Sequence, residues 1–359
     1  MTDLGPATAR HRRRVFWIAV QVAAAVLAAG LIWGVSRPTL EPFADRVMTP
    51  DAEVPPPGQA VTVRYFSIST LLISDGETAL MTDGYFTRFS NPLDPFLNPL
   101  ITPDRAAIAA GLERAEVDTL AAVLVGHSHF DHAMDAPIVA ARTGAVLVGS
   151  ASTANVGRGL DLPEAQIRVA EPGVAMRFGR FDVTFIRSAH VPLPFGLGAF
   201  GETIDAPLVP PARVWDYKEG GTYAILIEHP AGRLLIHGSA GFVPGMYRDT
   251  RVDVVLLGTG GLGFRSDAYQ RDYLAEVVTA TQARLVLPIH FEDLYAGDGP
   301  PRLPPRLSGN FARTMALLDT HVGAHVGAQV GARVNAATAV RLLPYEQPVT
   351  VLGEQTNRP

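Results

Sequence analysis

Three histidines and one aspartate lie within six consecutive positions, residues 127–132, which read HSHFDH. Imidazole nitrogens and carboxylate oxygens are donors with which proteins bind Zn²⁺ and similar divalent ions. On an extended backbone His127 and His129 share a face and can bind one ion, and a turn at the next residue would direct Asp131 and His132 to a neighbouring position. The alternative is a polar loop in which Asp131 caps the helix that follows. Three adjacent histidines have no role in such a loop, so the run predicts a metal site.

Further candidate ligands follow strand-like runs elsewhere in the chain. His190 comes after FIRSA and His290 after LVLPI, while His237 and Ser239 lie in LLIHGS. Strand ends that meet at one edge give loops a rigid scaffold on which to build a site. We expect His190 and His290 to be ligands. For His237 we favour a supporting donor that contacts a ligand.

The expected chemistry is hydrolysis. Zn²⁺ lowers the pKa of a bound water to about 7 and polarises a carbonyl or phosphoryl oxygen, so an ester, lactone, amide or phosphodiester can be attacked. Asp131 would be both a ligand and the catalytic residue that orients the water. The chain has no cysteine and no Gly-x-Ser-x-Gly, which excludes a cysteine nucleophile and disfavours a serine one. A net charge of −5 gives no electrostatic case for nucleic-acid binding.

Alternating strand-like and helical patterns predict an α+β domain whose sheets are covered by helices on their outer faces. The segments read as β-rich are 61–74, 78–83, 119–126, 145–150, 180–189, 222–229, 233–239, 252–259, 283–289 and 339–344. The segments read as helical are 103–116, 133–143, 268–281 and 309–320. The glycine-rich repeat at 321–333 argues against a firm helix, and we expect its His321 and His325 to be solvated.

The N-terminal region contains 21 consecutive uncharged residues, 15–35, directly after Arg12, Arg13 and Arg14. As a helix this run would be about 31 Å long, which is enough to cross a bilayer. The positive-inside rule then predicts a cytoplasmic tail (1–14) before a transmembrane signal-anchor helix (15–35). The prolines that follow predict a Pro-rich linker (36–58), and the hydrolase domain (59–350) comes after it. A cleaved signal peptide or a twin-arginine export signal is the alternative. Each of these interpretations places the catalytic domain in the periplasm or outside the cell.

The HxHxDH run, the later His190, the Gly-containing turn after a strand and the final His290 resemble, in that order, the metallo-β-lactamase superfamily. The phrase YFTRFSNPLD resembles the branch of ascorbate-6-phosphate lactonases and N-acylethanolamine phospholipase-D-like enzymes. The resemblance implies a four-layer αββα sandwich with two metals at one edge of its sheets. It implies two ligand sets. These are His127, His129 and His190 for the first metal, and Asp131, His132 and His290 for the second.

One position departs from that pattern. The superfamily usually has a metal-bridging Asp in the turn where this chain has Ser239. A neutral hydroxyl removes one negative charge from between two cations, so affinity for the second metal should fall. His237 lies two residues earlier and can compensate. The sequence therefore leaves open whether one or two zinc or other divalent ions bind.

A long insertion between His190 and Thr222 suggests a lid or substrate loop, with Phe195, Leu197, Phe200 and Trp215 lining an apolar pocket or touching the bilayer. Ordinary covering of the sheet edge is an equal alternative. The insertion and the membrane anchor together suggest an amphiphilic or lipid-like substrate. A non-catalytic metal-binding or scaffold protein of the same fold, or a β-lactamase proper, is the alternative function.

Overall fold

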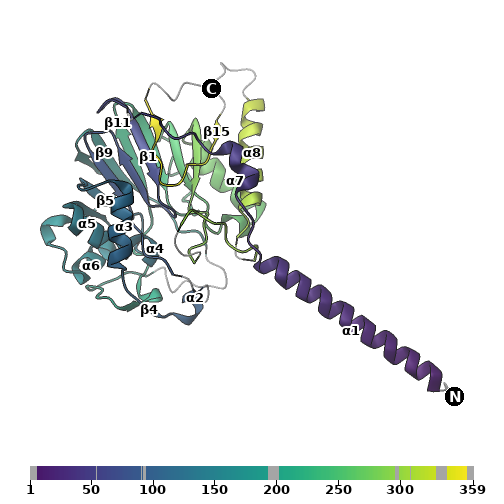
Figure 1. The fold of residues 1–359 in the computed structure, drawn as a ribbon. Coiled ribbons are helices and arrows are strands. Elements are labelled where there is room, and N and C mark those ends of the chain that lie inside the picture. The colour runs from purple at the N-terminus through teal and green to yellow at the C-terminus, as the bar shows by residue number, and fades with distance from the viewer. Residues whose placement is uncertain are drawn as a thin grey trace.

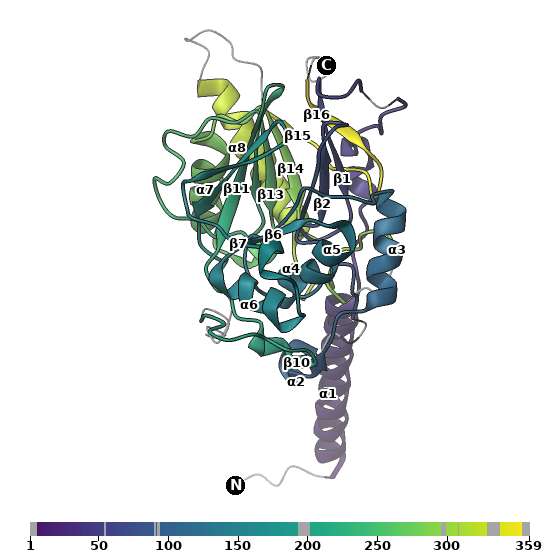
Figure 2. The ribbon, with the colours of Figure 1, turned by 90° about the vertical axis from the view of Figure 1, so that its left-hand side faces the viewer.

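The computed structural model describes residues 6–53, 55–89, 91, 94–192, 202–295, 299–307, 309–328 and 338–353. Two seven-stranded sheets pack face to face, and helices cover their outer faces (Figures 1 and 2). The α+β class and the four-layer αββα arrangement predicted from the sequence are confirmed.

Each sheet combines antiparallel and parallel neighbours. The first sheet has the order β16 (Val349–Leu352), β1 (Val61–Tyr65), β2 (Leu71–Ser74), β3 (Ala79–Thr82), β5 (Ala122–Leu124), β6 (Val146–Gly149) and β7 (Ile167–Val169). The second has the order β15 (Ala339–Val340), β14 (Leu285–Ile289), β13 (Val254–Gly258), β12 (Gly232–His237), β11 (Tyr223–His229), β9 (Phe181–Arg187) and β8 (Ala175–Phe178). A small ladder of β4 (Leu100–Ile101) and β10 (Ala212–Arg213) lies apart from both sheets.

Helices lie outside the two sheets, on opposite sides (Figure 2). The first sheet is covered by α3 (Arg105–Ala115), α5 (Ala136–Thr143) and α6 (Ala151–Gly159), with the short α2 (Asp94–Leu97) and α4 (Phe130–Ala133) near its lower edge. The second sheet is covered by α7 (Asp267–Leu274), which continues as the π-helical turn η7 (Ala275–Thr279), and by α8 (Phe311–Ala328). The 3₁₀ turns are η1 (Glu41–Arg46), η2 (Glu164–Gln166), η5 (Val214–Asp216) and η6 (Leu262–Phe264).

Period-two burial builds the core between the sheets. In β1 the side chains at 61, 63 and 65 are buried and those between them are half-buried, and β9 repeats this pattern at 181, 183 and 185. A second apolar cluster joins the outer face of the first sheet to α3 and α5, through side chains such as Val123, Ile108 and Val139. Both sheets are therefore fixed on each face, and the loops at their edges start from rigid strands.

Strand direction decides which loops meet. Strands β3 and β5 are parallel, as are β12, β13 and β14. Strand β9 is antiparallel to β11, and β11 is antiparallel to β12, so β9 and β12 point the same way. The carboxyl ends of β3, β5, β9, β12 and β14 lead into the segments that carry Asp83, 127–132, His190, Ser239 and His290.

Three local expectations differ from the structure. The helix α8 runs on to Ala328, so residues 321–328 of the glycine-rich repeat are helical, and His321 Nε2 lies 2.8 Å from Thr279 Oγ1 instead of being solvated. Packing of α8 against α7 outweighs the weak helix propensity of its glycines. The side chain of His325 lies outside the described residues. Strand β16 was not predicted, because it forms only by pairing with β1.

The segment 36–58, expected to be an extended linker, contacts the domain. It contains η1, and Met48 N donates to Leu342 O at 2.9 Å. Arg46 forms a bidentate ion pair with Asp319 of α8, at 2.6 and 2.8 Å.

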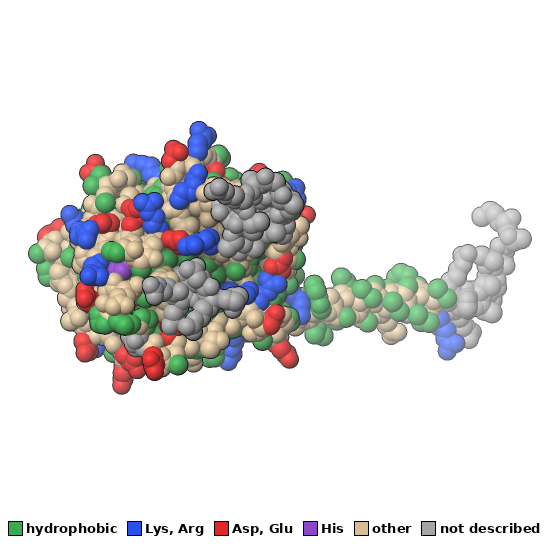
Figure 3. All heavy atoms as spheres, turned by 90° about the horizontal axis from the view of Figure 1, so that it is seen from above, with side chains coloured by type: hydrophobic (Ala, Val, Ile, Leu, Met, Phe, Trp, Pro, Cys, Tyr) green, Lys and Arg blue, Asp and Glu red, His purple; other side chains and the backbone are tan. Residues whose placement is uncertain are grey.

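The N-terminal helix α1 (Pro6–Val35) projects from the domain (Figures 1 and 3). Its part Arg13–Val35 is long and apolar enough to cross a membrane, and none of that stretch's most apolar window is buried. Figure 3 shows hydrophobic side chains along the helix, whereas acidic and basic side chains are interspersed over the visible face of the domain. By length and composition this helix suits either a membrane span or a signal sequence.

A buried carboxylate fixes the segment after β3 to the start of α5. Asp135 Oδ2 accepts hydrogen bonds from Phe86 N (2.8 Å) and Thr87 N (2.6 Å), and its Oδ1 accepts one from Thr87 Oγ1 (2.8 Å). Burial raises the pKa of Asp135 to about 6, even though these hydrogen bonds oppose the shift.

This raised pKa predicts a specific pH dependence of stability. The folded state holds the Asp135 proton more tightly than the unfolded state, whose pKa is about 3.9, so stability is lost as the pH rises from about 4 through about 6, by roughly 3 kcal/mol. Asp135→Asn should keep an acceptor for the backbone N–H groups and remove that loss. Urea unfolding of both proteins between pH 4 and pH 7 checks this, and parallel stability curves would contradict it.

Candidate metal centre

The loop that leaves β5 presents alternate side chains to opposite sides. His129 has extended backbone angles (φ −60°, ψ 157°), and α4 begins at the next residue. The Ser128 side chain is buried, with its Oγ 3.1 Å from Ser150 Oγ and 3.0 Å from Thr153 Oγ1. With Ser128 held by the start of α6, His127 and His129 point the other way, as the sequence pattern predicted.

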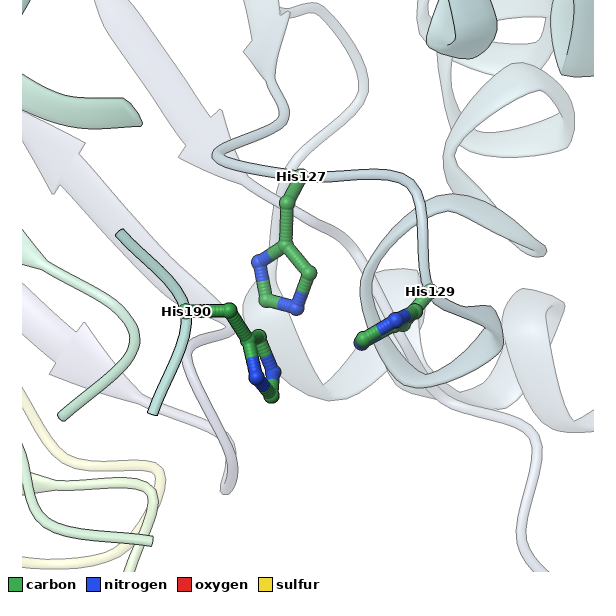
Figure 4. A group of neighbouring side chains, drawn as sticks. All are labelled: His127, His129 and His190. Carbon is green, nitrogen blue, oxygen red and sulfur yellow. The ribbon is translucent and has the colours of Figure 1, made fainter. Parts of the chain in front are cut away.

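The imidazoles of His127, His129 and His190 converge on one point (Figure 4). Their ring centroids are 4.7–5.0 Å apart in all three pairs, and one ligand atom from each side chain lies within 4.8 Å of the others. His190 Nδ1 donates to Val191 O at 2.8 Å, which leaves its Nε2 as the acceptor. His127 Nε2 is buried without a hydrogen-bond partner. A buried nitrogen of this kind is costly unless it meets a cation or a donor, so the group fits a divalent ion.

Asp131, His132 and His290 form a second group beside the first. Asp131 Oδ2 lies 3.4 Å from His132 Nε2 and 3.4 Å from His290 Nε2, and the two nitrogens are 3.3 Å apart. Donors placed tetrahedrally at about 2.0–2.1 Å around Zn²⁺ would lie about 3.3–3.4 Å from one another. The three distances therefore match three corners of a tetrahedral site. Asp131 is in the first turn of α4 and the N-cap is His129, so the helix-capping alternative for Asp131 is not realised.

Groups outside these two sets fix the orientation of the rings. His132 Nδ1 lies 2.7 Å from Asp83 Oδ2, a buried contact that directs the proton to Nδ1 and leaves Nε2 as an acceptor. His290 has left-handed backbone angles (φ 54°), and its N–H donates to Ile68 O at 2.8 Å. Gly260 packs against the His290 ring, since a Cβ there would lie 2.9 Å from Nδ1.

Asp83 was not among the site residues predicted from the sequence, where it is the last residue of the β-rich segment 78–83. The available signal was its place directly after β3, beside the strand that leads to the histidine run.

The electrostatics of the centre suit a cation. Burial and the surrounding imidazoles lower the pKa of His127 well below its usual value, and burial lowers that of His190. Burial alone would raise the pKa of Asp131, but His132 and His290 outweigh it and hold the carboxyl well below its usual range. Asp131 is therefore ionised at neutral pH, and the imidazoles of His127 and His190 are neutral, as metal ligands must be.

A family model described as a beta-lactamase superfamily domain matches residues 62–290. The chain belongs to this superfamily. Membership of this superfamily, with both donor groups at the edge of the sandwich, makes the protein a metal-dependent hydrolase. A search of curated protein sequences gives no significant match.

Solved structures with similar folds are distant. Igni18, a metallo hydrolase from Ignicoccus hospitalis, is 14% identical over 81% of this chain and 98% of its own, with a TM-score of 0.47. The metallo-beta-lactamase fold protein YhfI from Bacillus subtilis is 12% identical over 81% of this chain and 99% of its own (TM-score 0.46). The diiron beta-hydroxylase CmlA from Streptomyces venezuelae is 14% identical over 84% of this chain and 55% of its own (TM-score 0.46).

The present chain differs at Ser239 from the pattern expected for the superfamily. The Ser239 hydroxyl accepts a hydrogen bond from Val191 N at 3.1 Å, next to His190, so it supports the loop of a first-group histidine. His237 lies outside both groups. Its Nε2 is 3.1 Å from Ser188 Oγ and its Nδ1 3.3 Å from Tyr273 OH, and burial lowers its pKa to about 4.

The described part of the insertion, residues 202–221, covers the sheet edge. Ser128 N donates to Glu219 O at 2.8 Å, so the insertion backs the histidine loop. Trp215 is half-buried against the cluster under α3 and α5. Phe195, Leu197 and Phe200 lie outside the described residues.

Replacing Asp83 tests whether it orients His132. Asp83→Ala should weaken binding of the ion at the second group by about 10–100-fold, because the His132 ring loses the partner that fixes its tautomer. Isothermal titration with Zn²⁺ measures this directly.

Asp75 provides a matched control for that variant. It forms the same kind of buried pair, with Asp75 Oδ2 3.3 Å from His229 Nε2, but it follows β2, which ends at the opposite edge. Asp75→Ala should leave zinc affinity unchanged. Equal affinities for wild type and Asp83→Ala would remove Asp83 from the site.

Proposed function

We propose that the protein is a membrane-anchored hydrolase with two metal positions. In this proposal His127, His129 and His190 bind one ion, and Asp131, His132 and His290 bind the other. The spacing of 3.3–3.4 Å within the second group carries the proposal, because it matches the distance between donors that bind one tetrahedral Zn²⁺. We propose zinc, since histidine nitrogens dominate both sets.

The chemistry follows from these donors. When bound, the metal polarises a carbonyl or phosphoryl oxygen and activates water for attack. Asp131 supplies the one negative charge among the six donors, and its ionised state at neutral pH lets it accept a proton or hydrogen bond from the attacking water. Asp83 holds His132, and Ser239 holds the backbone beside His190, so both rings keep their positions during turnover.

The proposed substrate is an ester, a lactone or a phosphodiester. With Ser239 in place of a bridging carboxylate, two divalent ions and the single charge of Asp131 leave the centre with an excess positive charge. Such a centre favours a substrate that carries its own negative charge. Among the three classes this favours the phosphodiester.

We also propose that the domain works at a membrane surface, in the periplasm or outside the cell, with α1 as its anchor. The exposed apolar helix and the arginines before it support this orientation. An amphiphilic or lipid-like phosphodiester is then within reach of the site.

Removal of one ligand from each group tests the metal assignment. His127→Ala and His290→Ala should each lower the zinc content by about one ion per chain and reduce phosphodiesterase activity by at least about a hundredfold. Elemental analysis of the purified proteins gives the stoichiometry. His229→Ala removes a buried histidine at the opposite edge and should keep the full zinc content; loss of zinc in that control, or none in the others, would refute the ligand sets.

The substrate proposal is tested by comparing the rates at which two substrates are hydrolysed. Full-length protein in lipid vesicles should hydrolyse an amphiphilic phosphodiester faster than its short-chain soluble counterpart, and a chelator should abolish both activities. Equal rates, unchanged when detergent replaces the vesicles, would count against a membrane substrate. If the zinc-loaded protein hydrolyses neither compound, the result would favour a non-catalytic metal-binding role.

A further inference from the structure

The C-terminal end of α1 is packed against the domain. Gly34 is buried, although the hydrophobic side chains around it in the helix are exposed. Leu307 lies over Gly34, since a Cβ at Gly34 would come within 2.7 Å of Leu307 Cγ. Leu307 N also donates to Gly34 O at 3.0 Å. A side chain at position 34 would therefore have to displace Leu307.

Charged and aromatic side chains reinforce the contact on both sides of Gly34. The guanidinium of Arg306 lies 5.4 Å from the Trp33 ring centroid, which is a cation–π distance. Arg306 N donates to Ser36 O at 3.2 Å. Arg37 forms an ion pair with Asp293, whose side chain is almost fully buried.

These partners belong to the segment that follows His290. Asp293 is three residues beyond that histidine, and its N–H donates to Arg302 O at 2.8 Å, which ties the start of the segment to its later part. Glu292 lies between His290 and Asp293 in the sequence. Its carboxyl group contacts Tyr65 OH and accepts a hydrogen bond from Ile68 N at 3.3 Å. Ile68 O in turn accepts from His290 N. A continuous set of contacts therefore runs from the end of α1 to a ligand of the second group.

We infer that residues 33–37, at and just after the end of α1, are a positioning element of the metal centre: they clamp Asp293, Arg306 and Leu307 and so hold His290 in place. This inference rests on the proposed metal function. It gives the end of the helix a role besides anchoring. It also fixes the metal edge of the sandwich relative to the bilayer that α1 enters.

Two glycines of α1 make a matched pair for the test. Gly34 touches Leu307, whereas a Cβ at Gly30 would meet nothing within 4 Å. Gly34→Leu and Gly30→Leu add the same side chain to the same apolar helix. Both proteins are compared with wild type at full length in lipid nanodiscs, by hydrogen exchange of peptides covering 299–307 and by zinc retention against a graded chelator.

Gly34→Leu should speed exchange in 299–307 and weaken zinc binding by about tenfold, and Gly30→Leu should match wild type in both measurements. The weakening should persist in a His127→Ala background, where the second group holds the remaining ion, and vanish in a His290→Ala background. Adding Leu307→Ala to Gly34→Leu makes room for the new side chain and should restore both readouts.

Two failures are distinguishable. If Gly34→Leu exchanges and retains zinc like Gly30→Leu, the clamp is refuted while the metal centre stands. If wild type binds no zinc, the proposed function fails, and with it the positioning role; the exchange data then decide only whether α1 docks on the domain.

Discussion

Five imidazoles and one carboxylate share a largely buried edge of the sandwich, and this crowding of donors is the constraint on which the centre depends. His127, His132 and Asp131 are almost fully buried. A buried polar atom without a partner costs about 1–3 kcal/mol, and His127 Nε2 is such an atom. A divalent cation satisfies several donors at once, so the same arrangement that is unfavourable in the bare chain becomes a strong site when loaded.

The fold holds these donors together by taking them from the loops that follow three rigid strands, β5, β9 and β14. Neighbouring parallel strands bring Asp83 and residues 127–132 to one edge of the first sheet, and β9 and β14 bring His190 and His290 to the facing edge of the second. Hydrogen bonds with residues outside the ligand sets then fix parts of the site. Those of Ser128 fix the histidine loop, and that of Asp83 fixes the His132 ring. Precision comes from strands and their hydrogen-bonded neighbours, as rigid sites require.

The donors were predictable because they stand in a dense local run or directly after strands, and the layers were predictable from alternating patterns. What could not be predicted depends on contacts between distant segments. Asp83 looks like an ordinary turn residue until β3 lies beside β5. Strand β16 exists only through its pairing with β1, and the helix at 321–328 through the packing of α8 on α7. Local propensity lacked this information, since tertiary packing overrides it.

The end of α1 and the candidate metal centre lie at the same edge of the molecule. The loop after β14 must leave the sheet at the edge where His290 is needed, and its next residues are the surface on which the end of α1 rests. Without the end of α1, this loop would be held by the contacts of Glu292 with Tyr65 and Ile68 and by its own hydrogen bonds. With Gly34 under Leu307 and Arg37 paired to Asp293, the segment after His290 is tied at its start by the sheet and farther along by the end of α1. In the proposed arrangement, in which α1 enters a bilayer, the residues that limit the freedom of His290 are the same ones that set the position of the metal edge relative to that bilayer.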